Sequence, residues 1–197
     1  MADLIVSELQ GRFYENAYRG NLFSDGVSIN ALTANTITLT NSTTPILGVW
    51  NPTTSPVNLV IQQAALTCVS NNLTSGAGPG VFVWASSVGN GAISTGKAPF
   101  NRKTLANAGS QAKGMSFTAL TGLTNNLVIQ EGADFPTPSG LTYTTIGSTA
   151  LMPAFTAKQD LDGSLIVPPG GILALLNTIS CTTFSVAGRL MWAEVPI

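Results

Sequence analysis

The chain has 197 residues and a mass of 20.3 kDa, and it is rich in apolar residues and poor in charged ones. Hydrophobic residues make up 44% of it and charged residues 9%, whereas about 25% of the residues in an ordinary soluble domain are charged. The net charge of -1 and the pI near 5.2 provide no excess of Lys and Arg for binding a phosphate backbone, so we expect no nucleic-acid partner. The chain contains no histidine, which excludes catalysis or metal binding through histidine.

The sparse charge also bears on other partners. A surface with few charges lacks the mutual repulsion that keeps monomers apart, so we expect the chain to form a homo-oligomer. No run of residues approaches the roughly 18 uninterrupted apolar residues of a membrane helix. The first residues include Asp3 and Glu8 where a secretory signal has basic residues, so we expect neither a membrane partner nor secretion.

Two cysteines, Cys68 and Cys181, lie far apart in the sequence, in apolar or Thr-rich segments. We expect two buried thiols, because a free cysteine behaves as a small core residue, and a disulfide is the alternative that the sequence leaves open. The chain has no closely spaced cysteine pair and no histidine, so nothing in it matches a zinc site, and we expect no metal and no cofactor.

Charged residues are concentrated in the first 25 residues, after which none occurs until Lys97. Within this segment apolar residues recur at helical spacing from Ile5 to Ala17, which predicts a short helix or an extended N-terminal arm over residues 1–25. Aromatic residues and arginines are enriched at protein interfaces, so the arm is the predicted contact with a partner protein, and packing on the chain's own core is the alternative. The predicted contact residues are Arg12, Phe13, Tyr14, Tyr18, Arg19 and Phe23.

From residue 26 onward the pattern changes to the alternation of apolar and polar residues that is typical of β-strands. The segments with strand character are 29–32, 36–40, 46–50, 57–62, 65–69, 80–85, 115–120, 126–130, 141–146, 151–155, 164–167, 172–176 and 184–195. Turn residues separate most of them. We expect roughly eight to ten short strands from these segments, and strands at such intervals predict an all-β, antiparallel, jelly-roll-like β-sandwich over residues 26–197, as one domain.

The chain turns polar between residues 86 and 113, and this segment is the predicted long surface loop. It contains the basic residues Lys97, Arg102, Lys103 and Lys113, of which the first three form either a patch for an anionic partner or a solvated loop face. The stretch 91–98 matches a phosphate-binding P-loop up to its last position, where an alanine replaces the Ser or Thr that ligates Mg²⁺. A proline follows where a long helix should begin, so we expect no nucleotide site.

Two pairs of carboxylates remain as candidates for acid-base chemistry, Asp160 with Asp162 and Glu131 with Asp134. A glycosidase would need such a pair to face one cleft. Both pairs lie among Gly and Pro residues, where Asp commonly occupies turns, so we expect them to be turn residues. The chain is therefore not expected to be an enzyme.

Three stretches of the chain, in the order in which they occur, resemble those of a known class of proteins. They are Gly-Arg-Phe-Tyr-Glu-Asn-Ala-Tyr-Arg-Gly-Asn-Leu-Phe at 11–23, the stretch 49–61 that begins Val-Trp-Asn-Pro, and Ile-Val-Pro-Pro-Gly-Gly at 166–171 with Gly-Arg-Leu-Met-Trp-Ala-Glu-Val-Pro at 188–196. This order resembles the jelly-roll virion structural proteins of tailed phages, of the cement, decoration or head-fibre kind. The resemblance spans most of the chain.

The resemblance implies a sandwich, commonly trimeric, that binds the outer capsid surface and clamps neighbouring subunits of the major capsid protein. On this basis we expect a homotrimer that is made in the host cytoplasm and acts in the virion as a capsid cement or decoration protein, with residues 1–25 facing the capsid. Many weak contacts repeated over a shell stabilise it through multivalency. The alternative is a head-fibre or tail-associated protein that binds a receptor or a glycan, because the same architecture serves that purpose too.

Overall fold

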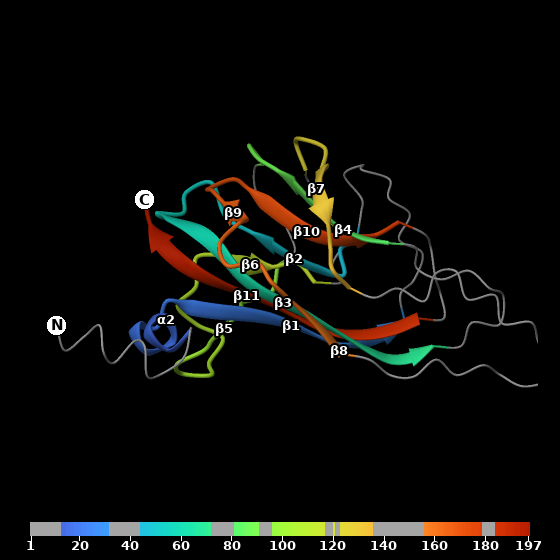
Figure 1. Cartoon of the computed structure of the whole chain (residues 1–197). Coiled ribbons are helices and arrows are strands. Elements are labelled where there is room, and N and C mark those ends of the chain that lie inside the picture. The colour runs from blue at the N-terminus through green and yellow to red at the C-terminus, as the bar shows by residue number, and fades with distance from the viewer. Residues whose placement is uncertain are drawn as a thin grey trace, which may run out of the picture.

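The computed structural model describes residues 13–31, 44–71, 81–90, 96–116, 120, 123–135, 156–178 and 184–197. In these residues two antiparallel β-sheets pack face to face, and one short helix precedes the first strand (Figure 1). No helix in this part of the chain is long and apolar enough to cross a membrane.

The helix and strands have the following bounds. Helix α2 spans Tyr14–Arg19. Sheet A has the order β5 (Phe100–Asn101), β1 (Leu22–Ala31), β11 (Phe184–Pro196), β3 (Val57–Asn71) and β8 (Thr156–Asp160), and β9 (Ile166–Val167) also pairs with β3. Sheet B has the order β6 (Lys113–Gly114), β2 (Leu47–Trp50), β10 (Ile172–Asn177), β4 (Phe82–Ser87) and β7 (Val128–Gly132).

The pairing of the longer strands identifies the topology. Leaving aside the two-residue strands β5, β6 and β9, the first strand pairs with the last, β1 with β11, and the second with the second-last, β2 with β10. The next pairs inward are β3 with β8 and β4 with β7. This is the nested pairing of an eight-stranded jelly roll, in which a long antiparallel hairpin folds over into two sheets. The predicted antiparallel jelly-roll-like sandwich is confirmed.

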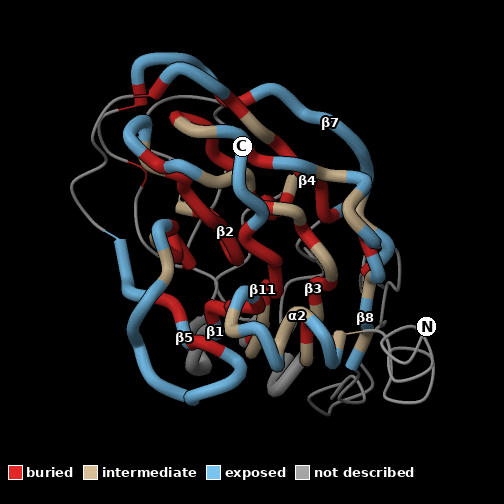
Figure 2. The backbone as a smooth tube through the Cα atoms, turned by 90° about the vertical axis from the view of Figure 1, so that its left-hand side faces the viewer, coloured by how far each residue is buried: buried red, intermediate tan, exposed pale blue. Residues whose placement is uncertain are grey.

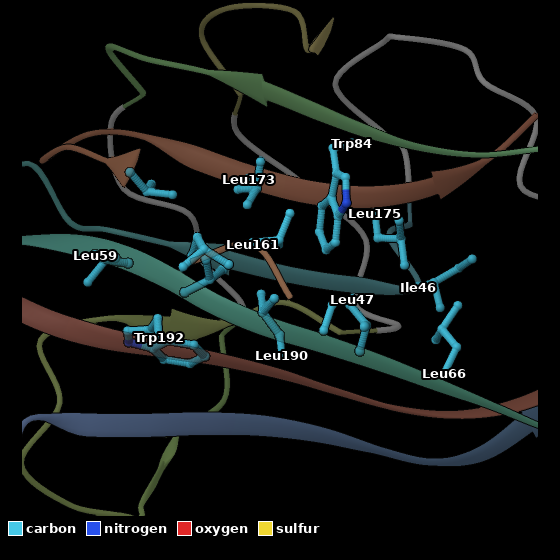
Figure 3. Packing of buried hydrophobic residues seen from close by; sticks show 14 of the residues in the cluster. Ile46, Leu47, Leu59, Leu66, Trp84, Leu161, Leu173, Leu175, Leu190 and Trp192 are labelled. Carbon is cyan, nitrogen blue, oxygen red and sulfur yellow. The ribbon is translucent and has the colours of Figure 1, made fainter. Parts of the chain in front are cut away.

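A buried apolar cluster fills the space between the sheets (Figure 3). Its largest side chains are Trp84 of β4 and Trp192 of β11, both fully buried. Trp84 also donates through Nε1 to Oε1 of Gln159 in β8 at 2.9 Å, which joins sheet B to sheet A. This hydrogen bond satisfies the one polar group of the buried Trp84 side chain.

A second apolar cluster covers the other face of sheet B. In β10, Leu173 and Leu175 face the first cluster, whereas Ile172, Ala174 and Leu176 belong to the second. Side chains from the segment after β6 complete it: Met115, Leu120, Leu123 and Leu127. Because β10 is covered on both faces, its sequence is a continuous apolar run and not an alternation.

Some predicted strands differ from those observed. The predicted strands 57–62 and 65–69 form one strand, β3, and the predicted strand 115–120 fails at Met115 and Ser116, which lie outside any strand. Strand β8 was not predicted, because only one of its five residues is apolar. The predicted strands 36–40, 141–146 and 151–155, and also Cys181, lie outside the described residues, and Cys68 lies in β3.

Candidate interaction surface

Helix α2 is short, and its charges and its C-cap stabilise it. Glu15 lies in the first turn and Arg19 in the last, where each complements the helix dipole. The two form an ion pair one turn apart, in which Arg19 Nε donates to Glu15 Oε1 at 2.8 Å. The helix ends at Gly20, whose φ of 81° is a left-handed conformation that glycine adopts without steric cost.

The packing of α2 decides which of its side chains face solvent. Phe13 and Ala17 lie against a small apolar cluster on the outer face of sheet A, formed by Leu22, Met191 and Ala193. The opposite side of the helix therefore faces water. Tyr14 and Tyr18 lie on that side one turn apart, 42% and 64% exposed, and their rings stack with centroids 5.9 Å apart and an interplanar angle of 13°.

A loop from β5 is fixed beside this helix by the side chain of Asn101. Asn101 Oδ1 accepts hydrogen bonds from the backbone N–H of Lys103 at 2.9 Å and of Thr104 at 3.3 Å, as in an Asx turn. Asn101 Nδ2 donates to the carbonyl of Gly20 at 2.8 Å, and the N–H of Arg102 donates to the carbonyl of Leu22 at 2.9 Å. Residues 102–109 are nevertheless all exposed, so the loop is tethered at its base and open to solvent along its length.

The loop places a cation beside the exposed aromatic pair and has an exposed apolar residue two positions further on. Lys103 Nζ lies 5.1 Å from the ring centroid of Tyr18, in cation-π contact. Leu105 is 71% exposed and has a φ of 57°, an uncommon conformation for a residue other than glycine. We call Tyr14, Tyr18, Lys103 and Leu105 the tyrosine surface.

A buried glutamate anchors the far end of the same loop. Glu194 of β11 accepts hydrogen bonds from the Ser110 hydroxyl and from the backbone N–H of Gln111, the latter at 3.1 Å. Its carboxylate is almost inaccessible to solvent. The loop is therefore held by side chains from β5 at one end and from β11 at the other.

The structure separates the six residues that were predicted to contact a partner. Tyr14, Tyr18 and Arg19 lie on the exposed side of α2, whereas Phe13 is half-buried against sheet A. Arg12 lies outside the described residues. Phe23 is only 3% exposed and lies in the core between the sheets, so its prediction as a surface contact is wrong for the folded chain.

The predicted boundary at residue 25 also falls inside the sandwich. Residues 22–25 belong to β1 and pair with β11. Alternation along β1 places Leu22 on the outer face and Phe23 on the core face. A deletion of residues 1–25 would therefore remove core contacts together with the arm.

Asp25 is a buried carboxylate at the edge where β1 meets β6. Ser116 Oγ donates to Asp25 Oδ2 at 2.7 Å, and Lys97 Nζ donates to the carbonyl of Ser116 at 3.2 Å. Burial raises the pKa of Asp25 above its ordinary value, and the hydrogen bond from Ser116 and the charge of Lys97 offset only part of that effect. The strand beside it fits only with glycine at position 114, because a Cβ there would lie 2.3 Å from Asp25 Oδ2.

The residues considered for catalysis do not assemble into one group. Glu131 lies within strand β7, so its prediction as a turn residue is wrong; Asp160 is the last residue of β8, and Asp162 lies in the following turn with a φ of 50°. Within the described ranges, no three carboxylates or cysteines lie close enough to hold a metal ion. Most of the P-loop-like stretch, 91–95, lies outside those ranges.

Comparisons with known proteins add no assignment. No protein family, no curated protein and no solved structure was found to match the chain. Its function has to be argued from the sandwich and the surface described above.

Proposed function

We propose that the chain is a structural protein of a phage virion, a cement or decoration protein that binds the outer surface of the capsid as an oligomer. The tyrosine surface is the proposed contact with the major capsid protein. The chain would act by binding neighbouring capsid subunits at once, with no chemical step.

The observation that carries this proposal is the exposed, stacked pair Tyr14 and Tyr18 on a helix that is itself fixed to the sandwich. Tyrosine is enriched at binding hot spots because its ring gives a large contact area for few rotatable bonds. With Lys103 beside the rings, the partner surface that fits is an apolar depression rimmed by carboxylates.

The sandwich also suits this role physically. Both its core and the outer face of sheet B are filled by the chain's own side chains, so partner contacts are left to the outer face of sheet A, the edges and the loops. Loops that are tethered at both ends can bind without a large loss of conformational entropy. The hydrogen bonds of Asn101 and Glu194 tether residues 102–109 at both ends in this way.

The direct test is binding to empty capsids of the phage that encodes the chain. Tyr14→Ser combined with Tyr18→Ser should leave the fold intact. It should lower the affinity for capsids, measured by co-sedimentation, by about thirtyfold or more, since hot-spot residues contribute about 2 kcal/mol or more. Val81→Ser, a change at an equally exposed apolar residue before β4, is the matched control. Capsid binding unaffected by the double change would refute the surface assignment, and a wild-type chain that ignores capsids would refute the cement function.

The second candidate, a fibre protein that binds a glycan, draws on the same tyrosine pair, because flat aromatic rings beside polar groups also suit sugar rings. A glycan array with the wild-type chain separates the two candidates. Glycan binding that is lost in the double tyrosine variant, without capsid binding, would favour the fibre role.

A further inference from the structure

Most exposed charges of the described residues lie at two opposite edges of the sandwich. Strands β5 and β6 form one edge, which we call the basic edge, and its basic residues are Lys97, Arg102, Lys103 and Lys113. Strands β7 and β8 form the other, which we call the acidic edge. Its carboxylates are Glu131, Asp134, Asp160 and Asp162, and Lys158 is its one basic residue among those described.

Hydrogen bonds across the sandwich show that each edge combines strands from both sheets. Ser116, just after β6, donates to Asp25 of β1, the strand beside β5. At the other edge Trp84 of β4, the strand beside β7, donates to Gln159 of β8. Figure 2 accordingly shows β5 on one side of the molecule and β7 and β8 on the other.

The carboxylates near the basic edge do not reach its surface. Asp25 and Glu194 are buried and bonded to groups of the chain itself. Glu15 is the one exposed carboxylate of the described residues that lies outside the acidic edge, and it is paired with Arg19. Solvent at the basic edge therefore meets unopposed positive charge.

We propose that the basic edge of one copy binds the acidic edge of the next, so that a second copy of this chain occupies each edge. Opposite charges bring the edges together and fix their register. The acidic edge adds apolar area, because Val128 and Ile129 of the edge strand β7 are exposed. A chain with only 9% charged residues has little other charge to oppose such contact.

The placement of opposite charges on opposite edges also limits which symmetry the assembly can have. A two-fold contact pairs a surface with itself, which would place basic edge against basic edge or acidic against acidic. A head-to-tail contact pairs unlike edges, and when its rotation closes it forms a cyclic ring. This inference specifies the oligomer of the proposed function, but its test needs no capsid, so the two can fail separately.

The test uses charge reversal of each edge in the full chain. Glu131→Lys with Asp134→Lys changes the net charge of the acidic edge from -3 to +1, and Arg102→Glu with Lys113→Glu changes that of the basic edge from +4 to 0. For each variant alone, the dissociation constant for self-association should be at least about tenfold higher than that of the wild type. Light-scattering mass and sedimentation velocity measure this at about 0.1 M and about 1 M NaCl, between which the screening length falls from about 10 Å to about 3 Å.

Complementation separates an edge contact from a general loss of stability. An equimolar mixture of the two variants should associate again at low salt, because the unchanged basic edge of the first variant can bind the unchanged acidic edge of the second. The change of Thr53 and Thr54, exposed in the turn after β2, to lysine adds charge away from both edges and should leave association unchanged. A wild-type chain that stays monomeric at low salt, or reversed variants that neither dissociate nor complement each other, would overturn the proposal.

Discussion

Replacing Asn101 with alanine should release the loop of residues 102–109 while leaving the sandwich folded. The Asn101 side chain connects three points, accepting from the N–H groups of Lys103 and Thr104 and donating to the carbonyl of Gly20. Alanine removes all three hydrogen bonds. The β5 backbone still pairs with β1, so the change acts on the loop and on its link to α2.

The size of the effect follows from the exposure of the groups left behind. A hydrogen bond contributes about 0.5–1.5 kcal/mol net, and more only where a lost partner leaves a buried group without water. Lys103 and Thr104 are exposed, so water can replace the amide oxygen at their N–H groups. We expect a loss of about 1–2 kcal/mol in all, which raises the population of the open loop by a factor of about 5–30.

Limited proteolysis reads out this population directly, because trypsin cleaves after Arg102 and Lys103. When loop opening is fast relative to cleavage, the cleavage rate follows the population of the open form. Asn101→Ala should be cut at these two sites about 5–30 times faster than the wild type. Asn126→Ala, at an exposed asparagine in front of β7, is the control. Cleavage at the wild-type rate in Asn101→Ala, together with an unchanged urea midpoint, would show that Asn101 does not hold the loop.

Two further substitutions test the packing and the buried charge. Gly171→Ala would place a Cβ 2.7 Å from the carbonyl oxygen of Pro168 and should cost about 1–3 kcal/mol in urea unfolding, whereas Gly132→Ala, where a Cβ meets nothing within 4 Å, should be neutral. Folding raises the pKa of Asp25. The stability that protonated Asp25 provides is therefore complete below about pH 3.8, the ordinary pKa of the group, and is lost as the pH rises through the folded-state pKa. Asp25→Asn has no proton to lose, so it should become more stable than the wild type as the pH rises through the folded-state pKa of Asp25. Parallel pH curves of the urea midpoint for the two proteins would contradict this.

The fold was largely predictable because most strands follow the period of a half-buried sheet or form a continuous apolar run. Strands fail to be predicted where polar side chains occupy inward or central positions. Gln62 and Gln63 interrupt the apolar pattern of β3 and made one strand look like two, although Gln63 is bonded to Asp160 of the neighbouring strand. Gln159 of β8 faces Trp84, a tertiary partner that a strand pattern does not contain.

The interaction surface was only partly predictable. Helical spacing allowed a short helix here, but Phe13 was expected as a contact beside Tyr14 and Tyr18, whereas it packs on sheet A and the two tyrosines face solvent. Phe23 was misplaced because it was grouped with these aromatics, whereas the period of β1 turns it into the core. The contact of Lys103 with Tyr18 joins distant parts of the chain through the pairing of β5 with β1, and a two-residue strand has no recognisable sequence pattern. The Asx turn at Asn101 is the local signal that could have marked an ordered loop.

The two proposals explain together how so small a surface could hold a protein on a shell. A standard protein interface buries about 800 Å² on each partner, and four side chains on α2 and its loop supply only part of that area. Rotation about one axis leaves the height of every group along that axis unchanged, so each copy in a ring presents its tyrosine surface at the same level. Once one copy binds, the others bind as linked sites, which can raise the overall affinity by about 10²–10⁴ without any new kind of contact. The edges would then build the ring and the tyrosines would attach it, with Lys103 at the place where the two surfaces meet.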